Sequence, residues 1–129
     1  MNESDLTRRL KSHLRGFWHR NHGSPTVSGF PDLEGVIGGI SHVIEVKKGH
    51  ITRDDKIRLE HYLTQRQLYN LSKYKENEAK ALLGVYLTDR KKWIFMDFEN
   101  RDKDFSDIEL EQRYWEQRLL MPLKPKGTK

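Results

Sequence analysis

The sequence contains no cysteine. This absence excludes disulfide bonds and zinc sites built on thiolates, and it gives no information on the redox compartment. The six histidines do not supply a zinc site either, because none of their spacings is typical of zinc ligands. Disulfide-stabilised domains and thiolate-zinc domains are therefore excluded.

Long apolar runs are missing as well. No stretch approaches the roughly 18 consecutive apolar residues of a membrane-spanning helix. The opening residues, MNESDLTRRLK, also lack the apolar segment of a signal peptide. We therefore expect a protein without membrane association that works in the cytoplasm of a bacterium or of a phage-infected host cell.

Internal repeats, low-complexity blocks and long linkers are absent too. The 129 residues suffice for one hydrophobic core and are too few for two. We predict a single domain over residues 1–121, followed by a short basic tail, PLKPKGTK, over residues 122–129.

Charge, in contrast, is abundant. Charged residues make up 33% of the chain, and 24 Lys and Arg outnumber 19 Asp and Glu, so the net charge is +5. A positive balance favours an anionic partner, most simply nucleic acid.

The apolar pattern predicts an alternation of helices and strands. The expected order is a helix within residues 2–20 with Gly16 near its end, a loop at 21–29, strands at 32–39 and 41–47 joined at Gly38-Gly39, a polar connection at 49–55, an extended piece at 56–62, a helix at 64–80, strands at 81–88 and 91–99, and a helix at 106–121. In the first helix Leu6, Leu10, Leu14 and Phe17 share one face. In the last helix Trp115 and Leu119 pack either on the core or on a second copy of the chain. This order predicts one α/β domain.

The stretch GFPDLEGVIGGISHVIEVKKG, residues 29–49, carries the chemistry. Pro31 stiffens the chain before Asp32, and a hairpin would return Glu45 beside Asp32. Glu45 and Lys47 are two residues apart on a strand, so they project from the same face. Two converging carboxylates form a site for a hard cation such as Mg²⁺, and the adjacent lysine can orient a water molecule or neutralise charge on a phosphate.

Pro31-Asp32 followed by Glu45-Val46-Lys47 resembles the motif of the PD-(D/E)XK nuclease superfamily. The wider pattern GFPDL, VIEVKKG and LTQRQ is similar to its VRR-NUC branch and to Holliday junction resolvase-type enzymes. The resemblance implies a restriction-endonuclease-like fold, with a mixed central sheet flanked by helices, and dependence on Mg²⁺ or Mn²⁺. It further implies that Asp32, Glu45 and the Val46 carbonyl bind the metal, while Lys47 acts on the attacking water or on the phosphate.

Two further site residues have alternative readings. Gln67 matches the glutamine that lies near the active site in the family, but it is also the capping-box partner of Thr64. Members of the family often carry an acidic residue on the first helix, and Glu3 is the candidate metal ligand and catalytic residue, with Asp5 as the alternative. Glu3 shares a helical face with Leu10 if the helix begins before it; otherwise it is a solvent-exposed acid at the N-terminus.

Basic and small polar residues around the motif are candidate contacts to DNA phosphates. Lys48 should point away from Lys47, toward DNA or solvent. The other candidates are Arg15, His19, Arg20, His22, Ser24, Lys124 and Lys126.

The sequence therefore predicts a Mg²⁺-dependent DNA endonuclease. Its small size favours recognition of DNA shape, with branched DNA or a Holliday junction as the sharper hypothesis, and symmetric cutting of two strands would require a homodimer. The alternative is a catalytically silent nuclease fold that binds DNA or protein, for example a phage accessory factor.

Overall fold

The structure is a computed structural model that describes residues 1–21 and 29–121. Its elements are α1 (Glu3–Lys11), β1 (Phe17–Arg20), β2 (Leu33–Ile37), β3 (Ile40–Ile51), β4 (Ile57–Leu59), α2 (Gln65–Glu76), β5 (Lys80–Leu87), β6 (Lys92–Asp97), the short 3-10 helices η1 (Phe98–Asn100) and η2 (Phe105–Ile108), and α3 (Glu109–Leu119). Within the described ranges no helix is long and apolar enough to cross a membrane.

The strands form one six-stranded mixed sheet in the order β1-β2-β3-β5-β6, with β4 paired to β3. β3 and β5 run parallel, and the other pairs are antiparallel. The predicted α/β class, a single domain with a mixed central sheet flanked by helices, is confirmed. The arrangement is consistent with a restriction-endonuclease-like fold.

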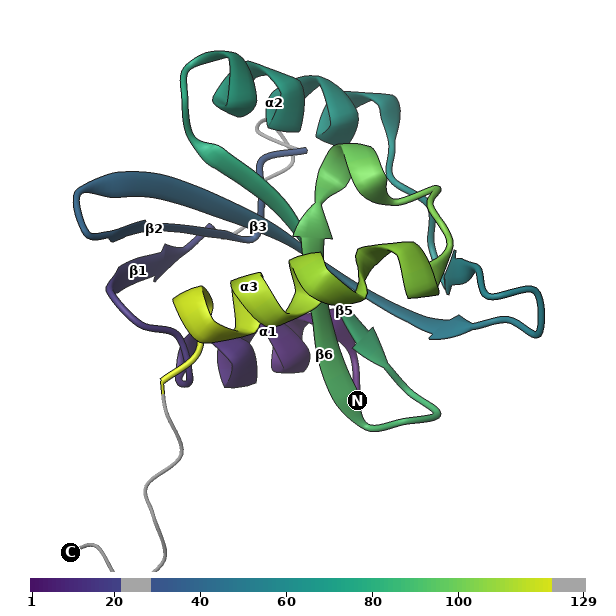
Figure 1. Ribbon diagram of the computed structural model, residues 1–129. Helices are drawn as coiled ribbons and strands as arrows, with labels where there is room; N and C mark the ends of the chain where they lie inside the picture. The colour runs from purple at the N-terminus through teal and green to yellow at the C-terminus, as the bar shows by residue number, and fades with distance from the viewer. Residues whose placement is uncertain (22–28, 122–129) are drawn as a thin grey trace, which may run out of the picture.

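Helices cover both faces of the sheet (Figure 1). Leu6 and Leu10 of α1 and Trp115 and Leu119 of α3 share a core cluster with residues of one face. On the other face, Leu71 of α2 packs with neighbouring strands. Trp115 and Leu119 are 7% and 0% exposed, so the structure assigns both to the core rather than to a contact with a second copy.

The β2–β3 hairpin turns at Gly38-Gly39 as predicted. Both glycines have positive φ, 56° and 78°, which suits a two-residue hairpin turn. β3 continues to Ile51, so the predicted polar connection from residue 49 is wrong in its first part. Gly49 stays in the strand because β4 pairs there, and a Cβ at Gly49 would lie 2.5 Å from the Arg58 carbonyl oxygen.

The first helix ends earlier than the apolar spacing suggested. α1 stops at Lys11, and Phe17 lies on β1 with 77% exposure, so its placement on the buried helical face is wrong. Gly16 has a φ of +86°, and an added Cβ would meet the Val36 carbonyl oxygen. The chain therefore turns at Gly16 into β1, a strand that pairs with β2 and that local pattern did not indicate.

Other boundaries shift by a few residues. α2 ends at Glu76 because the chain has to enter β5 at Lys80, where the prediction placed the helix end. Phe98 is buried, but it belongs to η1 and not to the preceding strand. α3 begins at Glu109, after η2.

Trp18 anchors β1 by packing against Gly35 of β2. The exchange Gly35→Ala should lower the free energy of unfolding by about 1–3 kcal/mol, because its methyl group would lie 2.2 Å from Trp18 Cδ2. Urea denaturation measures the loss. The control is Val36→Ala at the next position, which is 45% exposed and should change stability by less than about 0.5 kcal/mol. Equal losses would show that the contact with Trp18 is not the cause.

Candidate active site

The candidate site lies where β3, among the described residues, has no paired strand on one side. β2 pairs with β3 as far as Leu33 opposite Ile44, and β4 begins to pair opposite Gly49. In the described part of the chain, residues 45–47 of β3 have no strand partner on this side. Backbone groups and side chains of β3 are therefore available to other ligands at this gap.

Asp32 enters this gap from the residue before β2. Its Oδ2 accepts a hydrogen bond of 2.8 Å from the Val46 backbone N–H. The carboxylate thus takes the place of the missing strand and is held beside Glu45. Because the N–H and C=O of a strand residue lie on the same side, the Val46 carbonyl faces the gap as well.

Glu45 is only 4% exposed. Its Oε1 accepts a hydrogen bond of 3.3 Å from Gln67 Nε2 at the start of α2. Its Oε2 is buried and has no hydrogen-bond partner. A buried carboxylate oxygen without a partner is costly, and a bound cation is one way to satisfy it.

The electrostatics of the pair oppose ionisation. Burial raises the pKa of Glu45 well above its usual range, and the charge of the adjacent Asp32 carboxylate raises it further. Lys47 acts in the opposite direction, and Glu3 adds a smaller raising effect. In the metal-free protein, Glu45 therefore retains its proton at neutral pH.

Lys47 projects from the same face of β3 as Glu45. It is 5% exposed, which is unusual for a lysine, and its ammonium is close enough to favour the charged form of Glu45. The structure thus places a cation beside the two carboxylates.

The structure brings Glu3, and not Asp5, to the site. Asn2 caps α1 by accepting a hydrogen bond from the Asp5 backbone N–H, so Glu3 is the first helical residue. Glu3 Oε2 is buried without a partner, and its charge contributes to the raised pKa of Glu45. The Asp5 carboxylate instead pairs with the exposed Arg8 at 3.0 Å.

These oxygens fit a metal ion in their chemistry. Glu45 Oε2 and Glu3 Oε2 are both buried without partners, the charge of Glu3 acts on Glu45, and hard divalent cations prefer carboxylate oxygen. As they stand, the described side chains do not form a ready-made group of three or more His, Asp or Glu ligands. The fit therefore rests on the Asp32–Glu45 pair.

Gln67 has both of the roles that the sequence left open. It completes the capping box of α2, with its backbone N–H bound to Thr64 Oγ1 and its Oε1 bound to the Thr64 N–H. Its Nε2 still donates to Glu45. One side chain therefore fixes the start of α2 relative to β3.

The candidate DNA contacts are scattered. Arg20 donates a hydrogen bond to Ser4, beside Glu3, whereas Arg15 binds the Leu120 carbonyl at 2.8 Å, beyond the other end of α1. Lys48 lies on the opposite face from Lys47, with Nζ 3.2 Å from the Met1 carbonyl. His19 lies 3.9 Å from Glu34. Four other candidates fall outside the described residues: His22, Ser24, Lys124 and Lys126, the last two in the tail 122–129.

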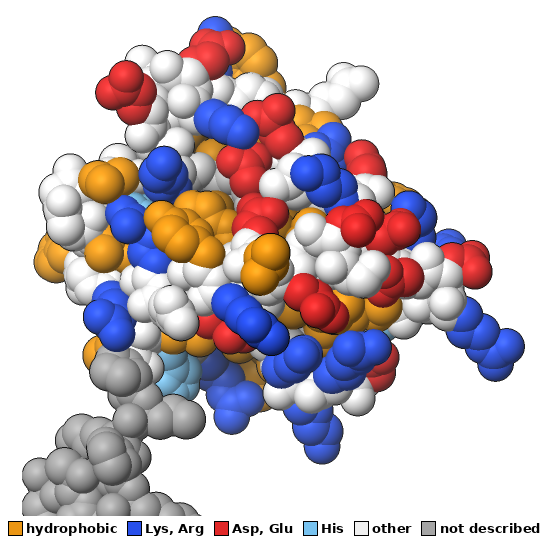
Figure 2. All heavy atoms as spheres, in the orientation of Figure 1, with side chains coloured by type: hydrophobic (Ala, Val, Ile, Leu, Met, Phe, Trp, Pro, Cys, Tyr) orange, Lys and Arg blue, Asp and Glu red, His pale blue; other side chains and the backbone are white. Residues whose placement is uncertain are grey.

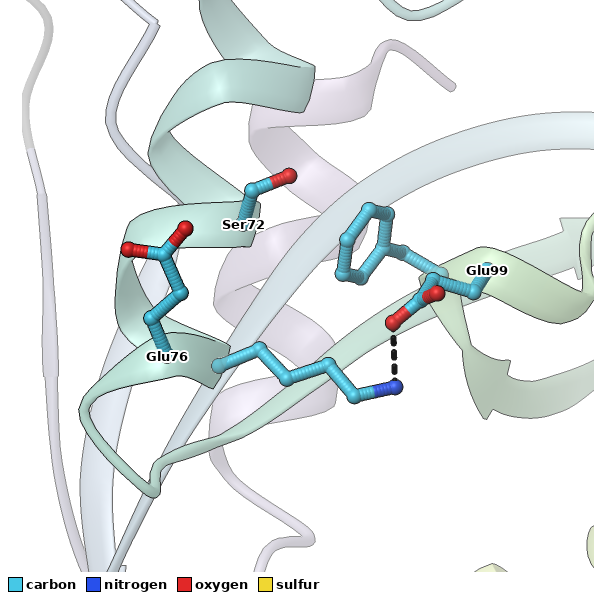
Figure 3. A pocket seen from close by; sticks show the side chains of 5 residues that line it. Ser72, Glu76 and Glu99 are labelled. Atoms are coloured by element: carbon cyan, nitrogen blue, oxygen red, sulfur yellow. Dashed lines mark ion pairs between the residues drawn. The ribbon is translucent and has the colours of Figure 1, made fainter.

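Surface charge does not single out the face that bears α3. Figure 2 shows acidic side chains among basic ones there. A pocket of about 390 Å³ between α2 and η1 is lined by Ser72, Lys75, Glu76, Phe98 and Glu99, none of them a candidate site residue. Lys75 pairs there with Glu99 (Figure 3).

Sequence reasoning missed three polar residues behind Asp32. Asn21, Glu34 and Tyr74 form a hydrogen-bonded group that reaches from β2 to α2. No local signal could have found them, because 53 positions of sequence separate Asn21 from Tyr74.

Comparison with known proteins finds a likeness among solved structures. No protein family matches the chain, and neither does any curated protein. Among solved structures, the chain is similar to Archaeoglobus fulgidus Hjc, a Holliday junction resolvase from an archaeal hyperthermophile. The two share 29% identity over 75% of this chain and 73% of that one, with a TM-score of 0.49. At this TM-score the likeness by itself assigns neither a family nor an activity, and the resemblance to the VRR-NUC branch stays a prediction.

The raised pKa of Glu45 predicts that the free energy of unfolding of the metal-free protein decreases as pH rises. Above its ordinary value of 4.5 the carboxyl ionises in the unfolded chain but keeps its proton in the folded one, so stability falls as pH rises. Glu45→Gln should therefore be more stable than the unaltered metal-free protein at pH 8, with a gap that grows by at most about 1.4 kcal/mol per pH unit. Urea denaturation in EDTA between pH 5 and 8 measures this gap.

The control for this experiment is Asp89→Asn, in the exposed turn between β5 and β6. It removes one carboxylate without removing a buried charge, so its stability should follow that of the unaltered protein. A gap for Glu45→Gln that stays constant or shrinks with rising pH would contradict the assignment.

Proposed function

We propose that the protein is a metal-dependent DNA endonuclease that hydrolyses phosphodiester bonds with Mg²⁺ or Mn²⁺. The observation that carries the proposal is the buried Glu45 oxygen without a partner, beside Asp32 and Lys47 at a gap in the sheet. A structural role does not account for a buried carboxyl group beside a second carboxylate, because the Asp32 charge opposes the ionisation of Glu45.

Asp32, Glu45 and the Val46 carbonyl would hold the ion, with Glu3 completing the set. A bound divalent cation would supply Lewis acidity toward the phosphate and would lower the pKa of a water molecule. Asp32 is kept in place by the Val46 N–H, and Glu45 by Gln67, so both carboxylates are oriented before any ligand arrives.

Lys47 would bind either the attacking water or a phosphate oxygen. Its buried stem fixes the ammonium on the same strand face as Glu45. A cation held there stabilises the negative charge that develops on the phosphate during hydrolysis.

The substrate class follows from charge and size. A net charge of +5 on 129 residues favours a polyanion. One small domain offers little surface for reading a long sequence, which favours recognition of DNA shape, such as a branch or four-way junction. Paired cuts in two strands would require two copies of the site, and we propose a homodimer for that reason.

Cleavage assays on a four-way junction, linear duplex and single strands test the activity. With Mg²⁺ the unaltered protein should cut at least one of them and should be inactive in EDTA. Asp32→Ala and Glu45→Gln should lose cleavage, and Lys47→Met should reduce kcat by about 10²–10³-fold. Asp89→Asn serves as the control that retains activity.

The substrates also decide between activities. Paired symmetric nicks on the junction alone would support junction resolution. Equal behaviour of the unaltered protein and Asp32→Ala on every substrate would overturn the catalytic proposal. DNA binding without metal-dependent cutting would support the silent binding module instead.

The double role of Gln67 allows a matched comparison with Thr64. Thr64→Ala and Gln67→Ala each remove half of the capping box, so both should cost about 1 kcal/mol of stability. Only Gln67→Ala also removes the hydrogen bond to Glu45, and it should weaken Mn²⁺ binding by about 10-fold. Urea denaturation and calorimetric Mn²⁺ titration measure the two effects. Identical Mn²⁺ affinities would place Gln67 in the helix cap alone.

A further inference from the structure

Asn21 binds the backbone on both sides of the Asp32 Cα. Its backbone N–H donates to the Asp32 carbonyl at 2.9 Å. Its side-chain Nδ2 donates to the Pro31 carbonyl at 2.7 Å. Both carbonyls of the Pro31-Asp32 segment are thus bound by one residue, which restricts the backbone from which the Asp32 carboxylate projects.

Asn21 is itself held by a carboxylate. Nδ2 also donates to Glu34 Oε1 at 3.0 Å, and the Tyr74 hydroxyl of α2 donates to the same oxygen. Glu34 therefore joins Asn21, which follows β1, to α2. Burial raises the pKa of Tyr74, and Glu34 raises it further, so the hydroxyl keeps its proton and remains a donor at neutral pH.

α2 thereby contacts the Glu45 carboxylate directly and is connected to the backbone that carries Asp32. Gln67 donates directly to Glu45, and Tyr74 reaches Asp32 through Glu34 and Asn21. Residues seven apart lie two turns along the same helical face, so one face of α2 serves both contacts.

We propose that Asn21, Glu34 and Tyr74 are positioning residues that orient Asp32 for metal binding through the Pro31-Asp32 backbone. This inference rests on the proposed function and deepens it. The three residues touch neither DNA nor metal in this role. They act by removing alternative positions of Asp32.

The Tyr74 hydroxyl is not needed to dock α2. Leu71 is fully buried against the sheet, and Lys75 pairs with Asp97 at 2.9 Å and with Glu99 (Figure 3). The Tyr74 ring packs against the same core cluster as Leu71 and would still do so as phenylalanine. Tyr74→Phe therefore isolates the hydrogen bond to Glu34, and Lys75→Met is a matched control on the same turn.

The first measurement is made without metal. The Val46 amide reports the position of Asp32, since it donates to the Asp32 carboxylate. Hydrogen exchange at Val46 should be faster in Tyr74→Phe and in Asn21→Ala than in the unaltered protein. In Lys75→Met it should be unchanged.

The second measurement is Mn²⁺ binding followed by single-turnover cleavage. Tyr74→Phe should bind Mn²⁺ about 10-fold more weakly, and its cleavage rate should recover at saturating Mn²⁺. The double variant Asn21→Ala/Tyr74→Phe should be no worse than Asn21→Ala, because both residues act through one connection.

The outcomes separate the inference from the function on which it rests. If the unaltered protein binds Mn²⁺ and cuts DNA while Tyr74→Phe matches Lys75→Met in exchange and affinity, the positioning role is overturned and the function stands. Additive losses in the double variant would also overturn the positioning role. If the unaltered protein neither binds Mn²⁺ nor cuts, the proposed function itself fails.

Discussion

A buried carboxyl group beside a second carboxylate is the constraint on which the rest of this structure depends. Asp32 and Glu45 meet beside an interrupted strand pairing, and burial makes the second negative charge costly. Groups from different elements hold the two side chains in place. β3 offers the Val46 amide to Asp32, α2 offers an amide to Glu45, and Lys47 supplies a positive charge.

The interruption in the sheet is what makes this arrangement possible. A continuous strand beside β3 would use the Val46 N–H and carbonyl in ordinary pairing and would exclude Asp32. Since β2 begins at Leu33, opposite Ile44, and β4 pairs with β3 only from Gly49, the β3 backbone between these positions is available for a ligand. On its other side, β3 stays paired with β5 in parallel through the site.

Local patterns predicted the parts of the site that depend on local structure. The Gly38-Gly39 turn fixes the hairpin register, and strand alternation places Glu45 and Lys47 on one face. The capping-box signature located the start of α2.

What the sequence could not predict depends on contacts distant in the chain. The apolar spacing through Leu14 to Phe17 looks helical, yet pairing with β2 makes Phe17 part of a strand. Gly49 looks like a loop residue until β4 covers it. The group of Asn21, Glu34 and Tyr74 exists only after three separate elements have folded together.

Gln67 meets two requirements with one side chain. Its backbone and carbonyl oxygen define where α2 begins, while its amide nitrogen faces Glu45. A substitution of Gln67 would therefore disturb both the start of α2 and the hydrogen bonding of Glu45. A descendant that lost the chemistry would still be under pressure to keep the glutamine, so its presence in a relative would not by itself mark an active enzyme.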